Sequence, residues 1–194
     1  MNTQTGYSIL ELLVTVAIVG VIGSLALVQY QVVGQSTKLN GETISAVGLV
    51  REMQSSALSP EKPSGFGDDQ NICGYVIFEG GSYTDTLTYH AVGTTGSATS
   101  SCDGNTYSDC YTNSGASCGN TEHIVKEAGQ LQLQNSEVRV PEQIFFETPF
   151  AYTQLGSGGL SNTTIELRNN SNSDITRTIT IEKGGFITAQ DLAP

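Results

Sequence analysis

Most residues between Tyr7 and Val28 are apolar, and this stretch contains one charged residue, Glu11, and no proline. At about 1.5 Å per residue, a helix of this length crosses a hydrocarbon core of roughly 30 Å. A helix is also the form in which a single segment satisfies its own backbone hydrogen bonds in lipid. The pattern therefore predicts a membrane-spanning helix over residues 7–28.

From Gln29 to about Leu58 the apolar positions recur every three or four residues, which is the spacing of one helix face. Pro60 should end this helix, because the residue before a proline avoids the α region. We therefore expect one continuous helix from residue 7 to residue 58. Its amphipathic extension, residues 29–59, should pack against a sheet through five side chains: Ile44, Val47, Val50, Met53 and Ala57.

Three glycines, Gly34, Gly41 and Gly48, recur every seven residues within this extension. Each weakens a helix by up to about 1 kcal/mol relative to alanine. They either form a groove for the close approach of another helix or share this period by chance. The sequence leaves both interpretations open.

After a linker at residues 61–71 the apolar period changes to two, which indicates strands. Residues 73–79 should form a strand with Tyr75 and Ile77 on one face and Val76 and Phe78 on the other. A turn is expected at residues 80–82, before a partner strand at 84–92. Further strands are expected at residues 124–127, 131–133, 137–140, 144–146, 163–168 and 176–182, with turns at 169–174 and at Gly184–Gly185. The predicted fold class is α+β: a long N-terminal helix packed on an antiparallel β-sheet domain that covers residues 60–194.

Glu11 is the one feature of the apolar segment that a simple anchor does not require. A charged residue at mid-membrane costs on the order of 3 kcal/mol, which the surrounding Leu, Ile and Val residues offset. No basic residue lies nearby in sequence, since Lys38 is the first Lys or Arg of the chain. Glu11 therefore either extends to the membrane interface or pairs with a positive group, on another copy of the chain or at a newly formed amino terminus.

A short polar leader ending in Gly6, the aromatic Tyr7, Glu11 four positions later and the apolar run at residues 12–20 resemble the prepilin signal of type IV pilins and type II secretion pseudopilins. The resemblance implies that a prepilin peptidase removes leader residues 1–6 by cutting between Gly6 and Tyr7, and that the new Tyr7 amine is methylated. It also implies that residues 7–28 become a filament-core helix in which Glu11 pairs with the Tyr7 amine of a neighbouring subunit. Such a pairing agrees with electrostatics, because opposite charges in a low-dielectric bundle offset part of each other's desolvation.

Three features depart from the usual pattern of this family. The first mature residue is Tyr7 where most members have Phe, the leader has no Lys or Arg, and Val28 stands where many pilins have a proline. These departures favour a minor or divergent member. The C-terminal region, with its Phe145–Phe146 strand, later strands and Gly184–Gly185 turn, resembles the β-domain of H-type minor pseudopilins and related minor pilins.

The 194-residue chain has 19 acidic and 8 basic residues, a net charge of −11, and it contains 22 glycines and no Trp. This lightly charged, turn-rich composition is typical of an extracytoplasmic β-rich domain. An acidic domain repels phosphate backbones, so a general nucleic-acid surface is disfavoured. The alternative hypothesis is a DNA-binding minor pilin of a competence filament. The acidic tail at residues 188–194 argues against it.

All four cysteines, Cys73, Cys102, Cys110 and Cys118, follow the predicted anchor. Three of them lie in a Ser/Thr/Gly-rich loop at residues 94–122. An even number of cysteines in an exported domain indicates disulfides, and four cysteines can pair in three ways. A zinc site is the competing interpretation, but spacings of eight residues without a CxxC pair do not match zinc ligation.

The sequence contains no catalytic motif near its two histidines, His90 and His123. His90 is expected on the solvent face of its strand. Asp68–Asp69 and residues 103–105 offer oxygen ligands for calcium, but neither completes a ligand set. We therefore expect solvated loop carboxylates, no metal or cofactor, and no enzymatic activity.

The leading hypothesis is a pilin-like structural subunit, either a minor pseudopilin or a minor pilin. It would be held in the bacterial inner membrane by a single pass, with its C-terminal domain outside the cytoplasm, and then assembled into a type II secretion pseudopilus or a type IV pilus. The expected partners are other pilin or pseudopilin subunits, the prepilin peptidase, the inner-membrane assembly platform and the membrane itself, and nucleic acid is not among them.

Overall fold

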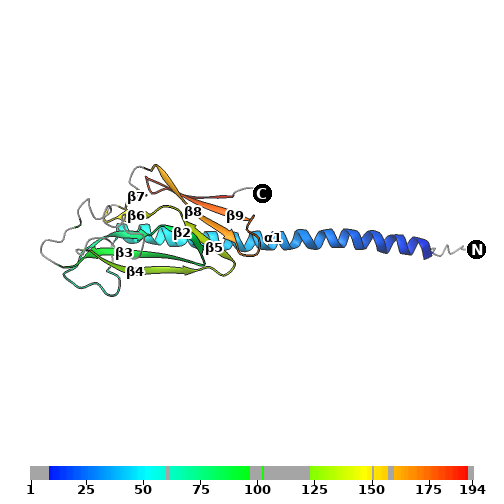
Figure 1. Cartoon of the computed structure of the whole chain (residues 1–194), viewed down its shortest axis with the longest axis horizontal. Helices are drawn as coiled ribbons and strands as arrows, with labels where there is room; N and C mark the ends of the chain where they lie inside the picture. Colours follow the sequence, from blue (N-terminus) through cyan, green and yellow to red (C-terminus); the bar gives the residue numbers. More distant parts are fainter. Residues whose placement is uncertain are drawn as a thin grey trace, which may run out of the picture.

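A computed structural model of the chain describes residues 9–59, 62–96, 102, 123–149, 151–156 and 160–191. In this part of the chain, one long helix extends from a domain built of two antiparallel sheets (Figure 1). The α+β layout predicted from the sequence is confirmed. The prediction did not say how many sheets the β domain has, and the strands divide into two.

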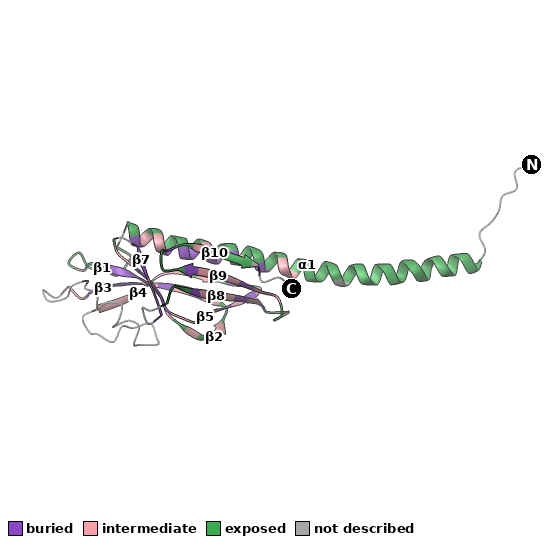
Figure 2. Ribbon diagram, turned by 90° about the horizontal axis from the view of Figure 1, so that it is seen from above, coloured by how far each residue is buried: buried purple, intermediate pink, exposed green. Residues whose placement is uncertain are grey.

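The helix, α1 (Ile9–Leu58), is 50 residues long, or about 75 Å at the usual rise per residue. It ends just before Pro60, as the proline predicted. The two halves of α1 differ in burial: the first is exposed along its length, whereas the second lies against the β domain (Figure 2). The boundary between the predicted membrane-spanning helix and its extension thus falls within the exposed half, and burial begins about seven residues later, near Gln35.

The first sheet, sheet A, has the strand order β4-β3-β1-β6-β7, and each neighbouring pair is antiparallel. Its strands are β1 (Ile72–Ile77), β3 (Thr86–Thr94), β4 (His123–Gln132), β6 (Ile144–Glu147) and β7 (Tyr152–Leu155). The predicted pairing of the first two long strands is confirmed, since Tyr75 of β1 lies opposite Ala91 of β3. The two short strands predicted at residues 124–127 and 131–133 fall in the single strand β4, except for Leu133, which follows it. The strand β7 was not predicted.

The second sheet, sheet B, has the order β10-β9-β8-β5-β2 and is also antiparallel throughout. Its strands are β2 (Gly80–Thr84), β5 (Ser136–Val140), β8 (Asn162–Asn169), β9 (Thr176–Glu182) and β10 (Ile187–Asp191). The expected turn at Gly184–Gly185 is present, with Gly185 in the left-handed region at φ 80°.

The turn predicted at residues 80–82 is wrong, because these residues belong to β2. Two glycines and a serine usually indicate a turn. Here the chain leaves sheet A after β1, forms the edge strand of sheet B and returns to sheet A as β3. The sequence of β2, GGSYT, does not have the alternation of apolar residues from which the other strands were predicted.

The main core lies where α1 meets both sheets. Sheet A contributes Tyr75 and Phe146, sheet B contributes Ile165 and Ile179, and α1 contributes Met53; each is at most 2 % exposed. The alternation predicted for the first strand is confirmed: Tyr75 and Ile77 face this core, and Val76 faces a second cluster on the opposite face of sheet A.

The buried face of α1 is rotated from the predicted stripe. Val50, Met53 and Ala57 are buried as expected, but Ile44 is 72 % exposed. The residues buried in addition lie to one side of the predicted stripe: Leu39, Thr43, Ala46 and Leu49. Thr43 can be buried because its hydroxyl donates a hydrogen bond to the Leu39 carbonyl at 2.8 Å. The apolar pattern predicted that Ile44 is buried. The structure buries Thr43 in its place, because the Thr43 hydroxyl is hydrogen-bonded within the helix.

Candidate functional site on the exposed half of the helix

The first half of α1 carries a continuous apolar surface. Every large apolar side chain described between Ile9 and Val33 is 47 to 82 % exposed, on all sides of the helix. Within the described residues, α1 is the one helix that is long and apolar enough to cross a membrane. A helix that is apolar all round requires an apolar environment, either lipid or other helices.

Glu11 lies in the first turn of this helix and is exposed. A carboxylate at this position interacts favourably with the helix dipole, which is a purely local reason for an acid here. No ion pair to Glu11 is found within the part of the chain that the structure describes. Gly6 and Tyr7, the predicted cleavage site, lie outside the described residues, so the predicted role of Glu11 in pairing with a Tyr7 amine stays a prediction.

The glycines of α1 lie on its open side. A Cβ atom added at Gly34, Gly41 or Gly48 would meet nothing within 4 Å, and the same is true of Gly20 and Gly23. The helix–helix groove and the chance period both stay open. The structure adds that Gly41 and Gly48 precede and follow the exposed Ile44 on the part of the helix surface that the β domain does not cover.

The helix is fixed to the domain by a carboxylate that the sequence did not single out. Glu42 lies at the edge of the buried helix face and points at the connection between β4 and β5. Its Oε1 accepts hydrogen bonds from the backbone N–H groups of Gln134 (3.0 Å) and Asn135 (2.9 Å) and from Asn135 Nδ2 (3.1 Å). Its Oε2 accepts a hydrogen bond from the Ser136 hydroxyl.

These contacts decide the pKa of Glu42. Burial by itself raises the pKa of this carboxyl, but the hydrogen bonds from Ser136, Asn135 and Gln134 together outweigh it and lower the pKa below its ordinary value of 4.5. The carboxylate form is therefore the one that binds the helix to the domain.

Arg177 of β9 makes a second polar connection near the point where α1 enters the domain. Its Nε donates to Asn40 Oδ1 at 2.7 Å, and its terminal nitrogens donate to Ser36 Oγ and to the Thr176 carbonyl, both at 2.9 Å. The residue is 9 % exposed. A buried guanidinium with several directed hydrogen bonds holds two elements in one relative position.

Two further contacts fix the C-terminal end of α1. Gln54 Nε2 donates to the Gly185 carbonyl at 3.1 Å, and the Tyr89 hydroxyl donates to Glu52 Oε1 at 3.2 Å. Burial, followed by the nearby Glu52 charge, raises the pKa of Tyr89 to about 12. With Glu42 and Arg177, these contacts distribute polar attachments along the whole packed half of α1.

A disulfide joins Cys73 in β1 to Cys102, 29 positions later in the sequence. This pairing agrees with the disulfide interpretation of the cysteines. In the chain-entropy description, a bridge over such a separation stabilises the fold by about 3 to 4 kcal/mol. Cys110 and Cys118, with most of the predicted loop at residues 94–122, lie outside the described residues.

The expected solvent position of His90 is corrected by the structure. Its side chain does lie opposite Leu87 and Tyr89, but this outer face of sheet A carries the second apolar cluster, so the ring is half-buried beside Phe78 at 5.3 Å between centroids. Burial lowers the pKa of His90, and the charge of Glu127 opposes this in part.

Of the candidate calcium ligands, the structure describes Asp68 and Asp69. Over the described part of the chain, no three His, Cys, Asp or Glu side chains form a cluster that could hold a metal ion. Asp68 and Asp69 lie in the turn before β1, and residues 103–105 lie outside the described residues.

The sequence did not predict the contacts of Glu42 and Arg177, because the residues in contact are far apart in the chain. Ser136 is 94 positions from Glu42, and Arg177 is 141 positions from Ser36. Neither pair belongs to a motif, so nothing in the sequence linked them.

The chain as a whole matches no protein-family model, no curated protein and no solved structure.

Proposed function

We propose that this protein is a pilin-like structural subunit, which is held in a membrane by the first half of α1 and then assembles with other subunits through the same surface. The observation that carries this proposal is the burial contrast along α1: an apolar, exposed half with one acid, continuous with a half that has one face buried in the domain. An anchor alone accounts for the apolar surface but does not require Glu11 within it.

The prepilin-like pattern at residues 6–20 supports the processing step of the proposal. Cleavage between Gly6 and Tyr7 would leave a positive amine four residues before Glu11. In an apolar bundle of helices, this amine on one subunit would pair with Glu11 on another, since each charge alone is costly to bury. The type II secretion pseudopilus and the type IV pilus are the two assemblies that fit such a subunit.

The test compares Glu11→Leu with Thr15→Leu in cells that produce the filament. Both changes place leucine on the same side of the helix one turn apart, and the Thr15 hydroxyl bonds only the Leu12 carbonyl within α1. We expect both variants to reach the membrane fraction and to be processed. Glu11→Leu should be depleted from sheared filaments about tenfold or more, whereas Thr15→Leu should be incorporated at the wild-type level.

The mass of the membrane-extracted protein provides an independent check on processing. The proposal requires a mature chain that begins at Tyr7, with a mass that includes one methyl group. A chain that retains residues 1–6, or equal incorporation of Glu11→Leu and wild type, would refute the assembly role.

A further inference from the structure

The domain contains a preformed groove that the proposed assembly role does not use. It has a volume of about 220 Å³ and lies between the edge strand β2 of sheet B and the first half of β3 in sheet A. Ligand pockets for drug-sized molecules usually have about 300 to 1,000 Å³. A groove of this size therefore suits a group no larger than a single ring.

The groove exists because β2 bows away from its neighbour. Gly80 pairs with Val140 and Thr84 pairs with Val138, so four steps along β2 correspond to two along β5. Gly80, Gly81 and Ser82 form most of this bulge, and their small size leaves the space unfilled. Bulges on edge strands are often found next to binding sites, because they redirect side chains and end the regular pairing.

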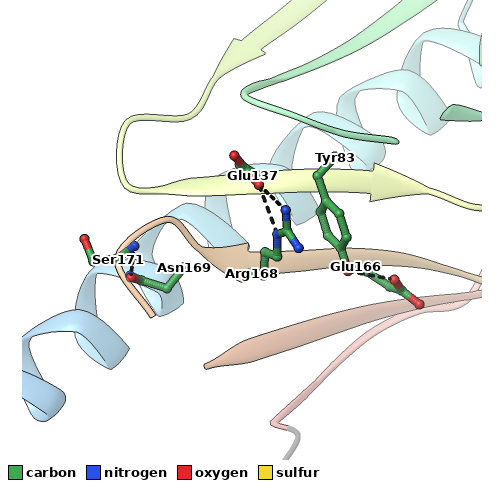
Figure 3. Close-up of polar contacts among 6 residues, drawn as sticks. All are labelled: Tyr83, Glu137, Glu166, Arg168, Asn169 and Ser171. Atoms are coloured by element: carbon green, nitrogen blue, oxygen red, sulfur yellow. Dashed lines mark hydrogen bonds and ion pairs between the residues drawn. The ribbon is translucent and has the colours of Figure 1, made fainter. Parts of the chain in front are cut away.

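The bowed strand is held in place from its other face (Figure 3). The Arg168 guanidinium lies 3.8 Å from the centre of the Tyr83 ring, and Arg168 also donates to Glu137 Oε2 at 3.0 and 2.7 Å. The Tyr83 hydroxyl donates to Glu166 Oε2 at 3.2 Å. These contacts fix β2 in its bowed form, so the groove is present before any ligand arrives.

The lining has a definite chemistry. Four hydroxyl groups, from Ser82, Thr84, Thr86 and Thr88, face it, and none of the described residues that line it is an Asp, Glu, Lys or Arg. The hydroxyls of Thr84 and Thr86 donate within the protein, but those of Ser82 and Thr88 make no bond to another described group. A hydroxyl both donates and accepts, so these groups match neutral partners that do the same.

One side of the groove is aromatic. Phe78 and His90 both line it, with their rings tilted by 60° and their centroids 5.3 Å apart. The Nδ1 atom of His90 is buried and has no hydrogen-bond partner among the described residues. Because this nitrogen is closed to solvent, His90 offers the groove its ring and not a hydrogen bond.

We propose that this groove binds a neutral sugar ring, the terminal residue or a single unit of a glycan. A pyranose has one face of C–H groups that packs on an aromatic ring and a rim of hydroxyls that donate and accept, and the groove offers both surfaces at the size of one ring. Ser82 and Thr88 bind the ring hydroxyls, and Phe78 packs against its apolar face beside the His90 ring. This proposal does not depend on filament assembly.

The experiment uses the full chain in lipid nanodiscs that contain no glycolipid, because a sugar-headed detergent would compete for the groove. Methyl glycosides of glucose, galactose, mannose and N-acetylglucosamine are tested separately by saturation-transfer NMR and titrated. We expect at least one of them to bind, and the glucuronic acid glycoside to bind less well than its neutral counterpart, since no cation lines the groove.

Two pairs of variants locate the binding. Ser82→Leu fills the groove from an exposed position, and Ser171→Leu makes the same change at an exposed turn away from it. Thr88→Val removes one lining hydroxyl at nearly constant volume, and Thr178→Val does so on β9, outside the groove. Ser82→Leu should abolish binding and Thr88→Val should weaken it about tenfold, while both controls bind as wild type does.

Three results would overturn the proposal. The first is that no neutral glycoside binds. The second is that Ser82→Leu binds as well as Ser171→Leu does. The third is that N-acetyl-leucine amide, an uncharged aliphatic probe, binds in the groove as tightly as the best glycoside, which would assign the site to an apolar side chain of another protein.

Discussion

Two charged residues, Glu42 and Arg177, fix the position of α1 on the β domain. Glu42 contacts three consecutive residues, two in the β4–β5 connection and Ser136 at the start of β5. Arg177 contacts two residues of α1 that lie one turn apart. Each is a charged group whose hydrogen-bonding geometry is directional, so each selects one position of the helix along its axis and one rotation about it. Apolar packing alone tolerates small shifts of both kinds.

Glu42 should make the stability of the domain depend on pH. Its pKa is lower in the folded protein than the ordinary value of 4.5, so the folded state releases this proton more readily than the unfolded state. The stabilisation is therefore complete above that value and is lost as the pH falls through the lower pKa of the folded state. Glu42→Gln should cost about 1 to 2 kcal/mol at pH 7 and should flatten the acid limb of the unfolding curve.

The measurement is thermal unfolding of the β domain, followed by circular dichroism between pH 3 and 7. Glu79→Gln is the matched control, because Glu79 is exposed and precedes β2 without a hydrogen bond to another described group. An acid limb that is equally steep in the Glu42 variant and in wild type would contradict the assignment.

At the scale of elements, α1 is one continuous helix with two different environments. The half from Leu39 onward is amphipathic, and its buried face meets both sheets. The same helix surface that carries Gly41, Ile44 and Gly48 faces away from the domain. The domain therefore leaves that surface of the packed half open as well.

The rotation of the buried face gives a direct comparison between two side chains of similar size. Met53 is fully buried and Ile44 is 72 % exposed, nine positions apart on the same helix. Met53→Ala should lower the free energy of unfolding by about 2 to 5 kcal/mol, because it leaves a cavity where α1 meets the sheets. Ile44→Ala should change it by less than about 0.5 kcal/mol. Denaturant unfolding of both variants in one buffer checks the difference, and equal losses would show that the face is assigned wrongly.

Sequence periodicity predicted the elements with strong patterns and failed where the pattern was weak. The strand at residues 176–182 and the end of the helix before Pro60 were predicted at the observed positions, because clean alternation and a proline are local signals. The strand β2 could not be predicted, since Gly80 and Gly81 lack the side chains on which alternation depends. The division into two sheets also depends on pairings between residues far apart in sequence, and no local pattern encodes them.

Part of the candidate site could be predicted from the sequence, and part could not. The apolar run and Glu11 are visible in the sequence because a membrane-length segment with one charge is rare. The attachments at Glu42 and Arg177, and the groove beside β2, required the fold, because each combines residues from separate elements.

At the scale of the whole molecule, the core of the β domain forms without the apolar half of α1. The polar attachments and the core begin at Ser36 and Leu39, and the residues before them make no contribution to the core that the structure describes. The exposed half therefore serves an environment outside the chain, and the domain should not need it to fold.

A chain shortened to begin at Gln29 should be soluble without detergent and monomeric, with the thermal unfolding midpoint of the domain in the full chain. The reason is that the shortening removes most of the exposed apolar surface and none of the buried face. Sedimentation velocity gives the oligomeric state, and circular dichroism gives the midpoint. Loss of the cooperative transition in the shortened chain would show that the first half of α1 contributes to the domain after all.

The absence of any proline between Ile9 and Leu58, together with the unbroken hydrogen-bonded helix, has a mechanical consequence. The helix is continuous from its apolar end to the part that packs against both sheets, so a force along the helix axis is passed to the domain. A displacement by one helical turn, about 5.4 Å, would carry the whole β domain through the same distance. The apolar helix and the β domain therefore move together along the helix axis.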